Sequence, residues 1–324
     1  MLTAYVPSGN TLERRVVAPG DGLPESAVWI DLVNPVPGED KVVERLIGVE
    51  VPTREEMQEI EVSSRLYVEH HARFMTATLM CNSDTATPKT TAVTFILLGH
   101  RLVTVRYDEP RPFTLVGNKL ARNCPAHVTG ETVLLDLLDA VIDRAADILE
   151  RIGLEVDRVS HDIFEPGNGE GQSLSYKDIL KAIGSKGDLT SKVRESLVSI
   201  GRLLLFLANE AEGMRWSKDV RLQLQAMQRD VLSLSDHATY LSNKITFLLD
   251  AMLGVVQIEQ NNVIKIFSVA AVVFMPPTLV ASLYGMNFRH MPELDWSYGY
   301  PMAIVLMLAA AVLPYYFFKW RKWL

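Results

Sequence analysis

The sequence predicts a membrane protein in which an α/β domain comes first, long helices follow, and two transmembrane helices form the C-terminal part. Residues 266–284 and 301–318 contain no charged side chain. Each run is about long enough to cross a hydrocarbon core of ~30 Å at ~1.5 Å per helical residue. Nearer the N-terminus, segments that alternate like strands are interleaved with short helical ones. We therefore expect an α/β domain at 1–128, a long-helix region at 129–263 and a transmembrane hairpin at 264–324.

The α/β domain is expected to be a mixed sheet flanked by helices. Thr53 and Glu56 form the pattern of a capping box, which predicts that a helix begins there. His70 and His71 are adjacent, so on a strand they would point to opposite faces and could not share one metal ion. The domain contains neither a phosphate-binding loop nor a nucleophile elbow, and we expect a scaffold rather than an enzyme. The expected strands cover 27–32, 66–80, 91–98 and 101–107, and the expected helices cover 40–48, 110–123 and a segment that begins at Thr53.

The long-helix region opens with an amphipathic helix at 129–164 that carries a row of acidic residues on one face. Like charges at this spacing repel one another, so we expect something to compensate them. Two interpretations remain open: a solvated face with lysines or arginines opposite, or a belt that holds divalent cations or their waters between subunits. The row consists of Asp136, Asp139, Asp143, Asp147 and Glu150.

Two further long helices are expected. One covers 175–209, with a weak point between Gly184 and Gly187, and the other begins near Lys218. No proline follows Lys218 until Pro276, so this helix would continue into the first transmembrane span and transmit motion as a rigid lever. Apolar residues recur along it in steps of four and three, which is typical of a packed long helix. They are Leu234, Ala238, Leu241, Ile245, Leu248, Met252 and Val255.

The first transmembrane span has one face of mostly small or polar residues. Hydroxyl groups need partners in lipid, so this face predicts either close helix packing or a water-filled path built from several copies of the helix. Two spans cannot enclose such a path, so the second interpretation requires a closed ring of subunits. Ile264, Phe267 and Met275 are candidates for an apolar constriction that gates by dewetting, although ordinary packing explains them too. The face consists of Asn261, Ile264, Ser268, Ala271, Met275, Thr278, Ser282 and Gly285.

The first span ends in a recognisable motif. Residues 284–288 read Tyr-Gly-Met-Asn-Phe, residues 291–294 read Met-Pro-Glu-Leu, and the C-terminal tail is basic. In these features the chain resembles the CorA family of divalent-cation channels, whose signature is a Gly-Met-Asn triplet at the outer end of the first of two spans. The resemblance is close from about Leu241 to Leu324 and looser upstream, where residues 29–32 and 53–67 match family landmarks.

The resemblance implies a function and a set of functional residues. It implies a homopentameric channel for Mg²⁺, with Co²⁺ and Ni²⁺ as secondary substrates, and no cofactor other than Mg²⁺ as a regulatory ligand. Positions matching Met275 and its neighbours form the hydrophobic constriction in the family, and an Asn matching Asn261 lies at the inner end of the pore. The implied selectivity filter is Gly285, Met286 and Asn287.

In the family, intracellular Mg²⁺ also binds acidic residues between neighbouring cytosolic domains and holds the channel closed. The positions of these ligands cannot be matched one for one in this sequence. Each candidate also fits an ordinary exposed helix carboxylate. The candidates are Asp230 and Asp236 on the third long helix, and Asp136, Asp139 and Asp143 in the acidic row.

The chemistry of Mg²⁺ supplies a separate reason for an amide at the filter. Mg²⁺ dehydrates reluctantly, so a site can select it by accepting hydrogen bonds from its water shell. A ring of Asn287 side chains, one from each subunit, would do this and still release the ion. Gly285 would let the chain turn where the helix ends. Without the resemblance, Asn287 fits a helix C-cap equally well.

Charge is divided unevenly along the chain. Residues 265–324 contain five basic and two acidic residues, a net of +3, so the total of −7 leaves −10 for the first 264 residues. An acidic soluble part argues against nucleic-acid binding. The basic tail predicts that both termini lie in the cytosol at the cytoplasmic (inner) membrane, with the loop 288–300 outside. In this loop Glu293 and Asp295 would raise the local cation concentration, whereas Arg289, where many family members carry an acidic residue, opposes them.

Other features are consistent with this topology, and two alternative functions stay open. No signal peptide is evident, and two cysteines without metal-ligand spacing indicate a reducing compartment. One alternative is a zinc transporter of the same family, although such relatives often depart from the Met of the triplet and Met286 is present here. The other is a membrane-tethered coiled-coil or enzyme domain without transport, which the polar face of the span and the triplet argue against.

Overall fold

The computed structural model describes residues 1–324 except 19–20, 86, 125–127, 165–174, 212, 214–215, 287–290 and 322–324. The chain forms two compact units, Met1–Leu248 and Leu249–Leu324. Helix α7 (Lys218–Tyr284) contributes residues to both units.

The first unit contains a seven-stranded mixed sheet with the strand order β2-β1-β3-β7-β6-β5-β4. β3 and β7 pair in parallel, with Asp31 opposite Thr104, and the other neighbouring strands are antiparallel. The predicted mixed sheet is thus confirmed. The strands are β1 (Leu2–Ser8), β2 (Thr11–Val17), β3 (Trp29–Val33), β4 (Leu66–Glu69), β5 (Ala72–Cys81), β6 (Lys89–Leu98) and β7 (Arg101–Arg106).

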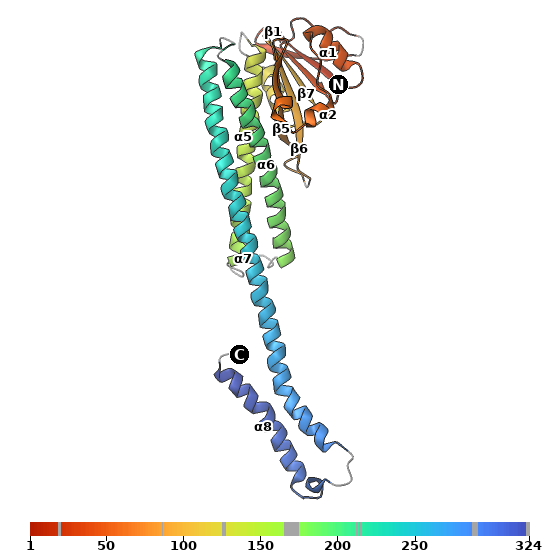
Figure 1. Cartoon of the computed structure of the whole chain (residues 1–324), viewed down its shortest axis with the longest axis vertical. Coiled ribbons are helices and arrows are strands. Elements are labelled where there is room, and N and C mark those ends of the chain that lie inside the picture. Colours follow the sequence, from red (N-terminus) through yellow and green to blue (C-terminus); the bar gives the residue numbers. More distant parts are fainter. Residues whose placement is uncertain are drawn as a thin grey trace. The chain divides into compact units, whose positions relative to one another are not determined.

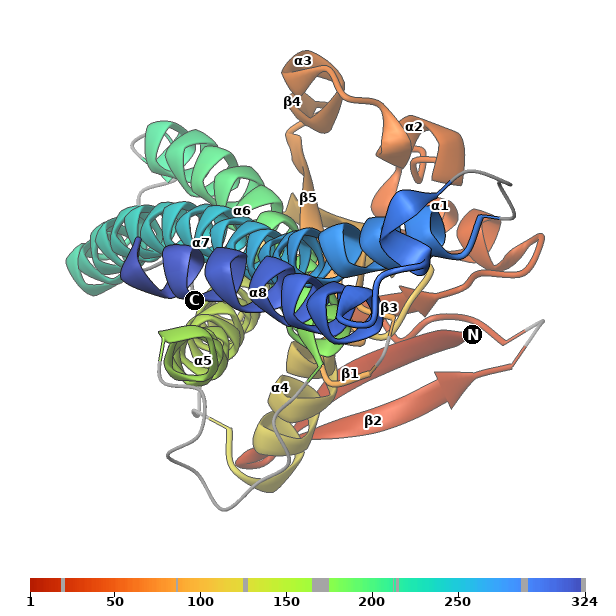
Figure 2. The same cartoon turned by 90° about the horizontal axis from the view of Figure 1, so that it is seen from below.

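Helices cover both faces of this sheet (Figures 1 and 2). On one face, Ile30 and Val105 of the strands pack in a core with Val43 of α1 and Met57 of α2. α4, α5 and α6 cover the other face. Thr53 caps α2 and exchanges hydrogen bonds with Glu56, so the predicted capping box is confirmed. The helices are α1 (Glu39–Ile47), α2 (Arg54–Gln58), α3 (Val62–Arg65), α4 (Arg111–Arg122), α5 (Gly130–Phe164) and α6 (Tyr176–Ala211).

Two details of the sheet differ from the sequence-based expectation. The single strand expected at 66–80 is a hairpin, because His70 and His71 adopt φ values of 46° and 64° between β4 and β5. Left-handed backbone ends the alternation of a strand, so the two histidines lie in a turn and the argument that they point to opposite faces does not apply. The first 17 residues, where no strand was expected, form the hairpin β1–β2, which turns at Gly9 with φ 61°.

The long helices of the first unit approach one another at glycines. A Cβ atom at Gly201 would lie 3.3 Å from Val231 Cγ1, and one at Gly187 would lie 3.6 Å from Ile245 Cγ2. α6 is continuous through Gly184 and Gly187, so the expected weak point is absent from this described helix. Glycine has a low helix propensity, and the packing of α6 against α7 compensates for it. Five members of the predicted apolar repeat are buried: Ala238, Leu241, Ile245, Leu248 and Met252.

A buried polar network lies between the sheet and α4. Asp31 accepts hydrogen bonds from Arg106 Nε at 3.1 Å, from Arg106 Nη2 at 2.9 Å and from Thr104 Oγ1 at 2.7 Å. Trp29 Nε1 donates to Thr104 Oγ1 at 3.0 Å, and the Arg106 guanidinium stacks on the Phe113 ring at 4.8 Å. A buried ion pair is tolerated when such partners satisfy both groups.

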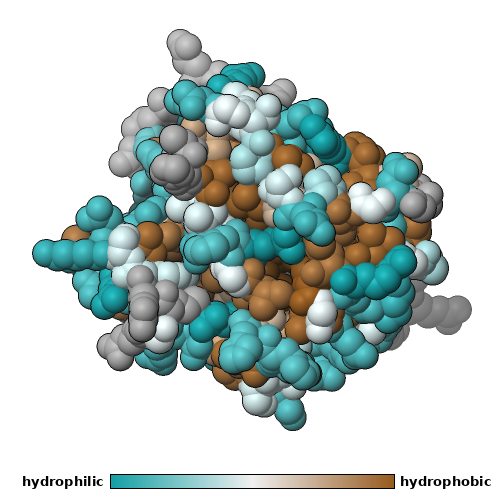
Figure 3. Space-filling model, turned by 90° about the horizontal axis from the view of Figure 1, so that it is seen from above, coloured by the Kyte–Doolittle hydropathy of each residue, from teal (hydrophilic) through white to brown (hydrophobic). Residues whose placement is uncertain are grey.

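The first unit has a mixed surface (Figure 3) and two buried cysteines. On the face shown in Figure 3, hydrophilic side chains surround smaller hydrophobic areas. Cys81 and Cys124 are both buried free thiols, and burial raises the pKa of each.

The second unit consists of the C-terminal part of α7, the short 3₁₀ helix η1 (Pro292–Leu294) and α8 (Gly299–Trp320). Both α7 and α8 contain apolar stretches long enough to cross a membrane, and only 6% of each stretch is buried. α7 stays helical through Pro276 and Pro277 and ends at Tyr284, next to the triplet. The two spans predicted from hydropathy are therefore helices.

Candidate ion pathway and acidic row

The candidate pore face of α7 is uncovered in the single chain. Exposed fractions reach 62% for Ile264, 71% for Phe267 and 69% for Met275. Large apolar side chains that a folded unit leaves open indicate a place for lipid or a partner. Every predicted pore residue on α7 is exposed: Asn261, Ile264, Phe267, Ser268, Ala271, Met275, Thr278 and Ser282.

The covered side of the span lies about half a turn away from this face. At 3.6 residues per turn, Val273, Val280 and Tyr284 point away from Ile264 and Ser282, and all three are half-buried. The chain's own contacts thus cover an apolar side of the helix and leave the small and polar side open. This arrangement fits both interpretations of the face, helix packing between chains and a water-filled path.

Thr278 shows how a hydroxyl is accommodated on the open face. Its Oγ1 donates to the Phe274 carbonyl oxygen at 2.7 Å, one turn earlier in the same helix. The hydroxyl hydrogen is therefore used, whereas the oxygen lone pairs remain free to accept hydrogen bonds from outside. Pro276 and Pro277 have no N–H group, so they leave two carbonyl groups of the preceding turn without their helical donors.

The triplet at the end of the first span is described only in part. The Gly285 N–H donates to Ala281 O at 2.9 Å, and the Met286 N–H donates to Leu283 O at 3.4 Å. A Cβ atom at Gly285 would lie 3.0 Å from Ala281 O, and its φ is outside the left-handed region. The glycine therefore serves a close approach rather than a left-handed turn. Asn287, the centre of the predicted filter, lies outside the described residues.

Two carboxylates are open to solvent in the loop between the spans. Glu293 lies in η1, and Asp295 is the residue that ends η1. Both are exposed. Their exposure leaves both carboxylates within reach of solvent.

The acidic row on α5 is compensated in part, by Lys119 at Asp136 and by Arg144 at Asp147. Lys119 Nζ of α4 lies 3.1 Å from Asp136 Oδ1. Burial raises the pKa of Asp139, and the charges of Asp143 and Asp136 raise it further. Asp230 of α7 acts in the same direction. The fold thus brings one of the two candidates on the third long helix close to the row.

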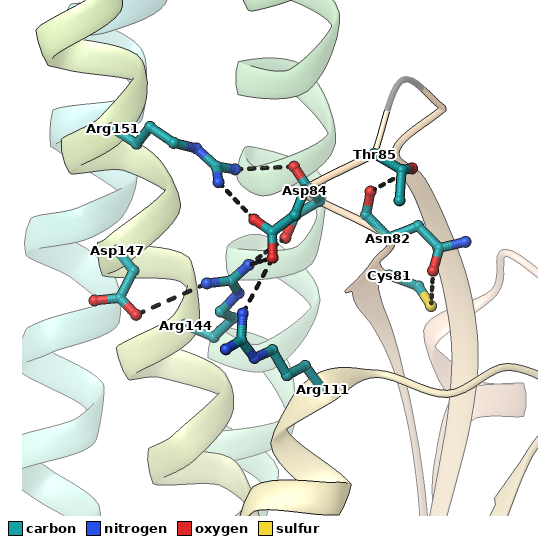
Figure 4. A network of polar contacts seen from close by, with 9 residues as sticks. Cys81, Asn82, Asp84, Thr85, Arg111, Arg144, Asp147 and Arg151 are labelled. Atoms are coloured by element: carbon teal, nitrogen blue, oxygen red, sulfur yellow. Dashed lines mark hydrogen bonds and ion pairs between the residues drawn. The ribbon is translucent and has the colours of Figure 1, made fainter.

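The arginines of α5 that could compensate the row bind a different carboxylate (Figure 4). Arg151 Nη1 and Arg144 Nη2 donate to Asp84, in the loop between β5 and β6, at 2.5 and 2.6 Å. Arg111 Nη1 of α4 adds a third bond at 3.1 Å. These hydrogen bonds, first that of Arg151 and then that of Arg144, hold the pKa of Asp84 at about 2 instead of 3.8. Arg144 Nη1 is still 4.0 Å from Asp147.

We call Asp84 with Arg111, Arg144 and Arg151 the Asp84 clamp. The sequence did not predict it, because its members come from distant segments. Asp84 is 60 residues from Arg144 and 67 residues from Arg151. The one local signal is the spacing of the two arginines by seven residues, which places them on the same face of a helix. That spacing does not identify the carboxylate they bind.

The remaining regulatory candidate is isolated from the row. Asp236 is exposed, and no ion pair or charge effect links it to Asp139 among the described residues. In the part of the chain that the structure describes, no three Asp, Glu, His or Cys side chains are arranged to hold a metal ion. A cation at the row would have to bind through its water shell or share ligands with another chain.

Comparison with known proteins gives a consistent result over the full chain. The family described as CorA-like Mg²⁺ transporter protein matches residues 24–320. The chain is 36% identical over 324 residues, 100% of both chains, to proteins named magnesium transport protein CorA in Yersinia pseudotuberculosis serotype I (strain IP32953) and Escherichia coli (strain K12). The complete structure of the CorA magnesium transporter from Methanocaldococcus jannaschii has a TM-score of 0.76 at 17% identity, covering 100% of this chain and 99% of that chain.

Proposed function

This chain belongs to the family of CorA-like Mg²⁺ transporter proteins, and on that premise we propose that it is an oligomeric channel through which hydrated Mg²⁺ enters the cytosol. It has the CorA fold, it is a membrane protein, and its family is one of transporters rather than enzymes. The observation that supports the proposal most directly is the open face of α7, where small and polar residues are exposed in an otherwise apolar span.

The channel is proposed to be a ring of identical chains, in line with the pentamer that the family resemblance implies. One chain supplies one open face, and a face of this kind can enclose water only when copies surround an axis. The exposed apolar side chains beside it would be buried against neighbouring helices and lipid. Oligomerisation thus completes the burial that the single chain leaves unfinished.

The proposed pathway has an amide ring at the outer end and apolar side chains below it. Asn287 would accept hydrogen bonds from the water shell of Mg²⁺, with Gly285 and Met286 holding the end of the helix in place. Thr278 and Ser282 would offer further oxygen acceptors. Met275, two turns inside Ser282, would form part of a constriction that closes by dewetting. The other proposed lining residues are Asn261, Ile264, Phe267, Ser268 and Ala271.

Cytosolic Mg²⁺ is proposed to regulate the channel at the acidic row. Asp139 already has a raised pKa because it is partly buried beside Asp143 and Asp136. A divalent cation would relieve this repulsion, and its loss would restore it. Asp230 is the favoured partner from α7 because its charge reaches Asp139. Asp236 has no such link and would act only through a neighbouring chain.

The location follows from the charges at the ends of the spans. The basic tail after α8 supports a topology with both termini in the cytosol, at the cytoplasmic (inner) membrane. The loop with Glu293 then faces outward, where its carboxylate would concentrate divalent cations at the mouth. Lipid, divalent cations and other copies of this chain are the proposed partners.

Flux into sealed vesicles tests the proposal. Purified full-length protein, reconstituted in vesicles loaded with an indicator dye, should admit Mg²⁺, and Asn287→Ala should reduce the flux at least tenfold because the amide ring is lost. Asn262→Ala is the matched control, since Asn262 is an exposed amide one position away from the open face. It should leave the flux unchanged.

Each other outcome has a defined meaning. Uptake of Zn²⁺ in preference to Mg²⁺ would assign the chain to zinc transport. Absence of any divalent-cation uptake in folded, oligomeric protein would contradict a channel function. A normal flux in Asn287→Ala would remove this residue from the filter and leave the channel proposal in place.

A further inference from the structure

Gly299, the first residue of α8, is buried in a stretch where the neighbouring side chains are exposed. A Cβ atom at this position would overlap the Glu293 carbonyl oxygen and lie 3.3 Å from the Glu293 carbonyl carbon. Contact with backbone cannot be relieved by a rotamer change. Position 299 therefore has room for hydrogen only, unless η1 moves.

Backbone conformation does not explain this glycine. Its φ lies outside the left-handed region, so any residue could adopt it without strain. Alanine has a higher helix propensity than glycine, by about 1 kcal/mol in helix interiors. By local preference alone, Gly299→Ala would stabilise the start of α8. The reason for glycine is thus the tertiary contact with η1.

The contact closes a compact turn between η1 and α8. The Gly299 N–H donates to Trp296 O at 2.9 Å, and the Met302 N–H donates to Tyr298 O at 3.0 Å. The rings of Trp296 and Tyr298 meet edge to face, with centroids 6.0 Å apart. The carbonyl group of Glu293 lies directly against Gly299, the first residue of α8. The turn therefore fixes where η1 stands relative to α8.

We propose that Gly299 is a positioning residue for ion entry, because it holds the turn that presents the Glu293 and Asp295 carboxylates at the outer mouth of the channel. This inference rests on the proposed function. Exposed charges influence ions only within a Debye length, about 8 Å at physiological salt. A displacement of η1 would move these carboxylates in every chain and thus weaken the attraction of Mg²⁺ to the mouth. The conduction steps deeper in the pore do not depend on it.

Kinetics of Mg²⁺ uptake into vesicles test the role. Gly299→Ala should raise the KM for Mg²⁺ about three- to tenfold and leave the maximal flux nearly unchanged. The rise should disappear near 1 M monovalent salt, where the Debye length is about 3 Å. It should also be absent when Gly299→Ala is added to Glu293→Gln with Asp295→Asn, since the carboxylates it positions are gone. Gly184→Ala, in an exposed helical position with open space around it, is the matched control.

Two measurements keep the inference testable apart from the proposed function. Hydrogen exchange should show faster exchange of the amides around residues 292–302 in Gly299→Ala than in the wild type, whether or not the protein conducts. If Gly299→Ala does not assemble, Pro292→Gly loosens η1 without a clash and should raise KM in the same direction.

Three results would overturn the inference. They are an unchanged KM in both variants, a loss of maximal flux at constant KM, and a KM effect that persists without the two carboxylates. A wild-type protein that does not take up Mg²⁺ at all would instead contradict the proposed function, and hydrogen exchange alone would then decide whether Gly299 holds the turn.

Discussion

Polar side chains are buried and paired in the interior of the first unit, whereas they are exposed on the first transmembrane span. Asp31 and Arg106 are 3% and 7% exposed, and hydrogen bonds from the same chain satisfy both. Thr278 and Ser282 are exposed in the apolar C-terminal part of α7, and the single chain does not cover them. The first region is complete in one chain, whereas the second leaves side chains open for lipid and, in the proposed channel, for further copies of the chain.

This difference separates polar side chains that stabilise the fold from polar side chains that serve function. A buried polar group with partners in its own chain specifies the fold, because leaving it unpaired would cost several kcal/mol. A polar group on an open apolar helix contributes nothing to the single chain's interior. It is retained for contacts that form outside the single chain.

The largest expected effect tests the buried polar network of the first unit. Asp31→Ala should lower the free energy of unfolding by about 3–5 kcal/mol, because it leaves the Arg106 guanidinium buried without its counter-charge. Thermal or chemical unfolding of the detergent-solubilised full chain, followed by circular dichroism, measures it. Glu13→Ala removes an exposed pair with Arg15 and should have no measurable effect. Equal results for both variants would mean that the buried pair does not hold the sheet to α4.

The next effect tests the open face of α7. Met275→Ser should raise Mg²⁺ leak at inhibitory Mg²⁺ concentrations several-fold, because a polar side chain lowers the barrier to wetting of the constriction. Ile266→Ser is the control, since Ile266 is also exposed but lies on the side of the helix opposite Met275. Vesicle flux measures both. A similar leak in the two variants would assign Met275 to helix packing and remove it from the gate.

A smaller effect concerns the Asp84 clamp and depends on pH. The pKa of Asp84 is about 2 in the folded chain and ordinarily 3.8, so the clamp stabilises the fold above about pH 4 and is lost as the pH falls toward 2. Asp84→Asn should cost less than about 1 kcal/mol at pH 7, because the carboxylate is 45% exposed. Denaturant unfolding at pH 7, 4 and 2.5 should show the difference from wild type shrinking. A difference that stays constant would exclude a charge effect.

The smallest effect concerns the acidic row. Asp139 has a raised pKa, so its ionised form costs stability above that pKa and protonation relieves the cost at lower pH. At pH 7, Asp139→Asn should therefore raise the metal-free stability by a few tenths of a kcal/mol and remove the further stabilisation by Mg²⁺. Melting temperatures with and without Mg²⁺ measure this, with Asp236→Asn as the control. If Asp236→Asn alone abolishes the Mg²⁺ effect, the regulatory site lies elsewhere on α7.

Much of the architecture could be predicted from local patterns. The capping box at Thr53, the uncharged runs that became α7 and α8, and the buried repeat from Ala238 to Leu248 all depend on short spacings. Such patterns reflect helix geometry, which needs no distant partner. The open face of α7 was predictable for the same reason.

The errors and omissions have two causes, local backbone turns and contacts between distant residues. The sequence around His70 and His71 continues the alternation of a strand, yet a positive φ at both residues reverses the chain there. The hairpin β1–β2 is short, and its stability comes from pairing with β3. The Asp84 clamp joins residues 60 or more positions apart. Only the Asp84 contacts are remote in sequence, whereas the two hairpins close at tight turns whose backbone conformation the residue types do not reveal.

By itself, the sequence determined which segments enter the membrane and which face of α7 stays polar, because hydropathy and helical period are properties of neighbouring residues. Only the tertiary structure decided that two arginines of α5 bind Asp84, that the charge of Asp230 reaches Asp139, and that Gly299 has room for nothing but hydrogen. Charge pairing and close contact depend on which distant groups the fold brings within a few ångströms, and no local pattern records that distance.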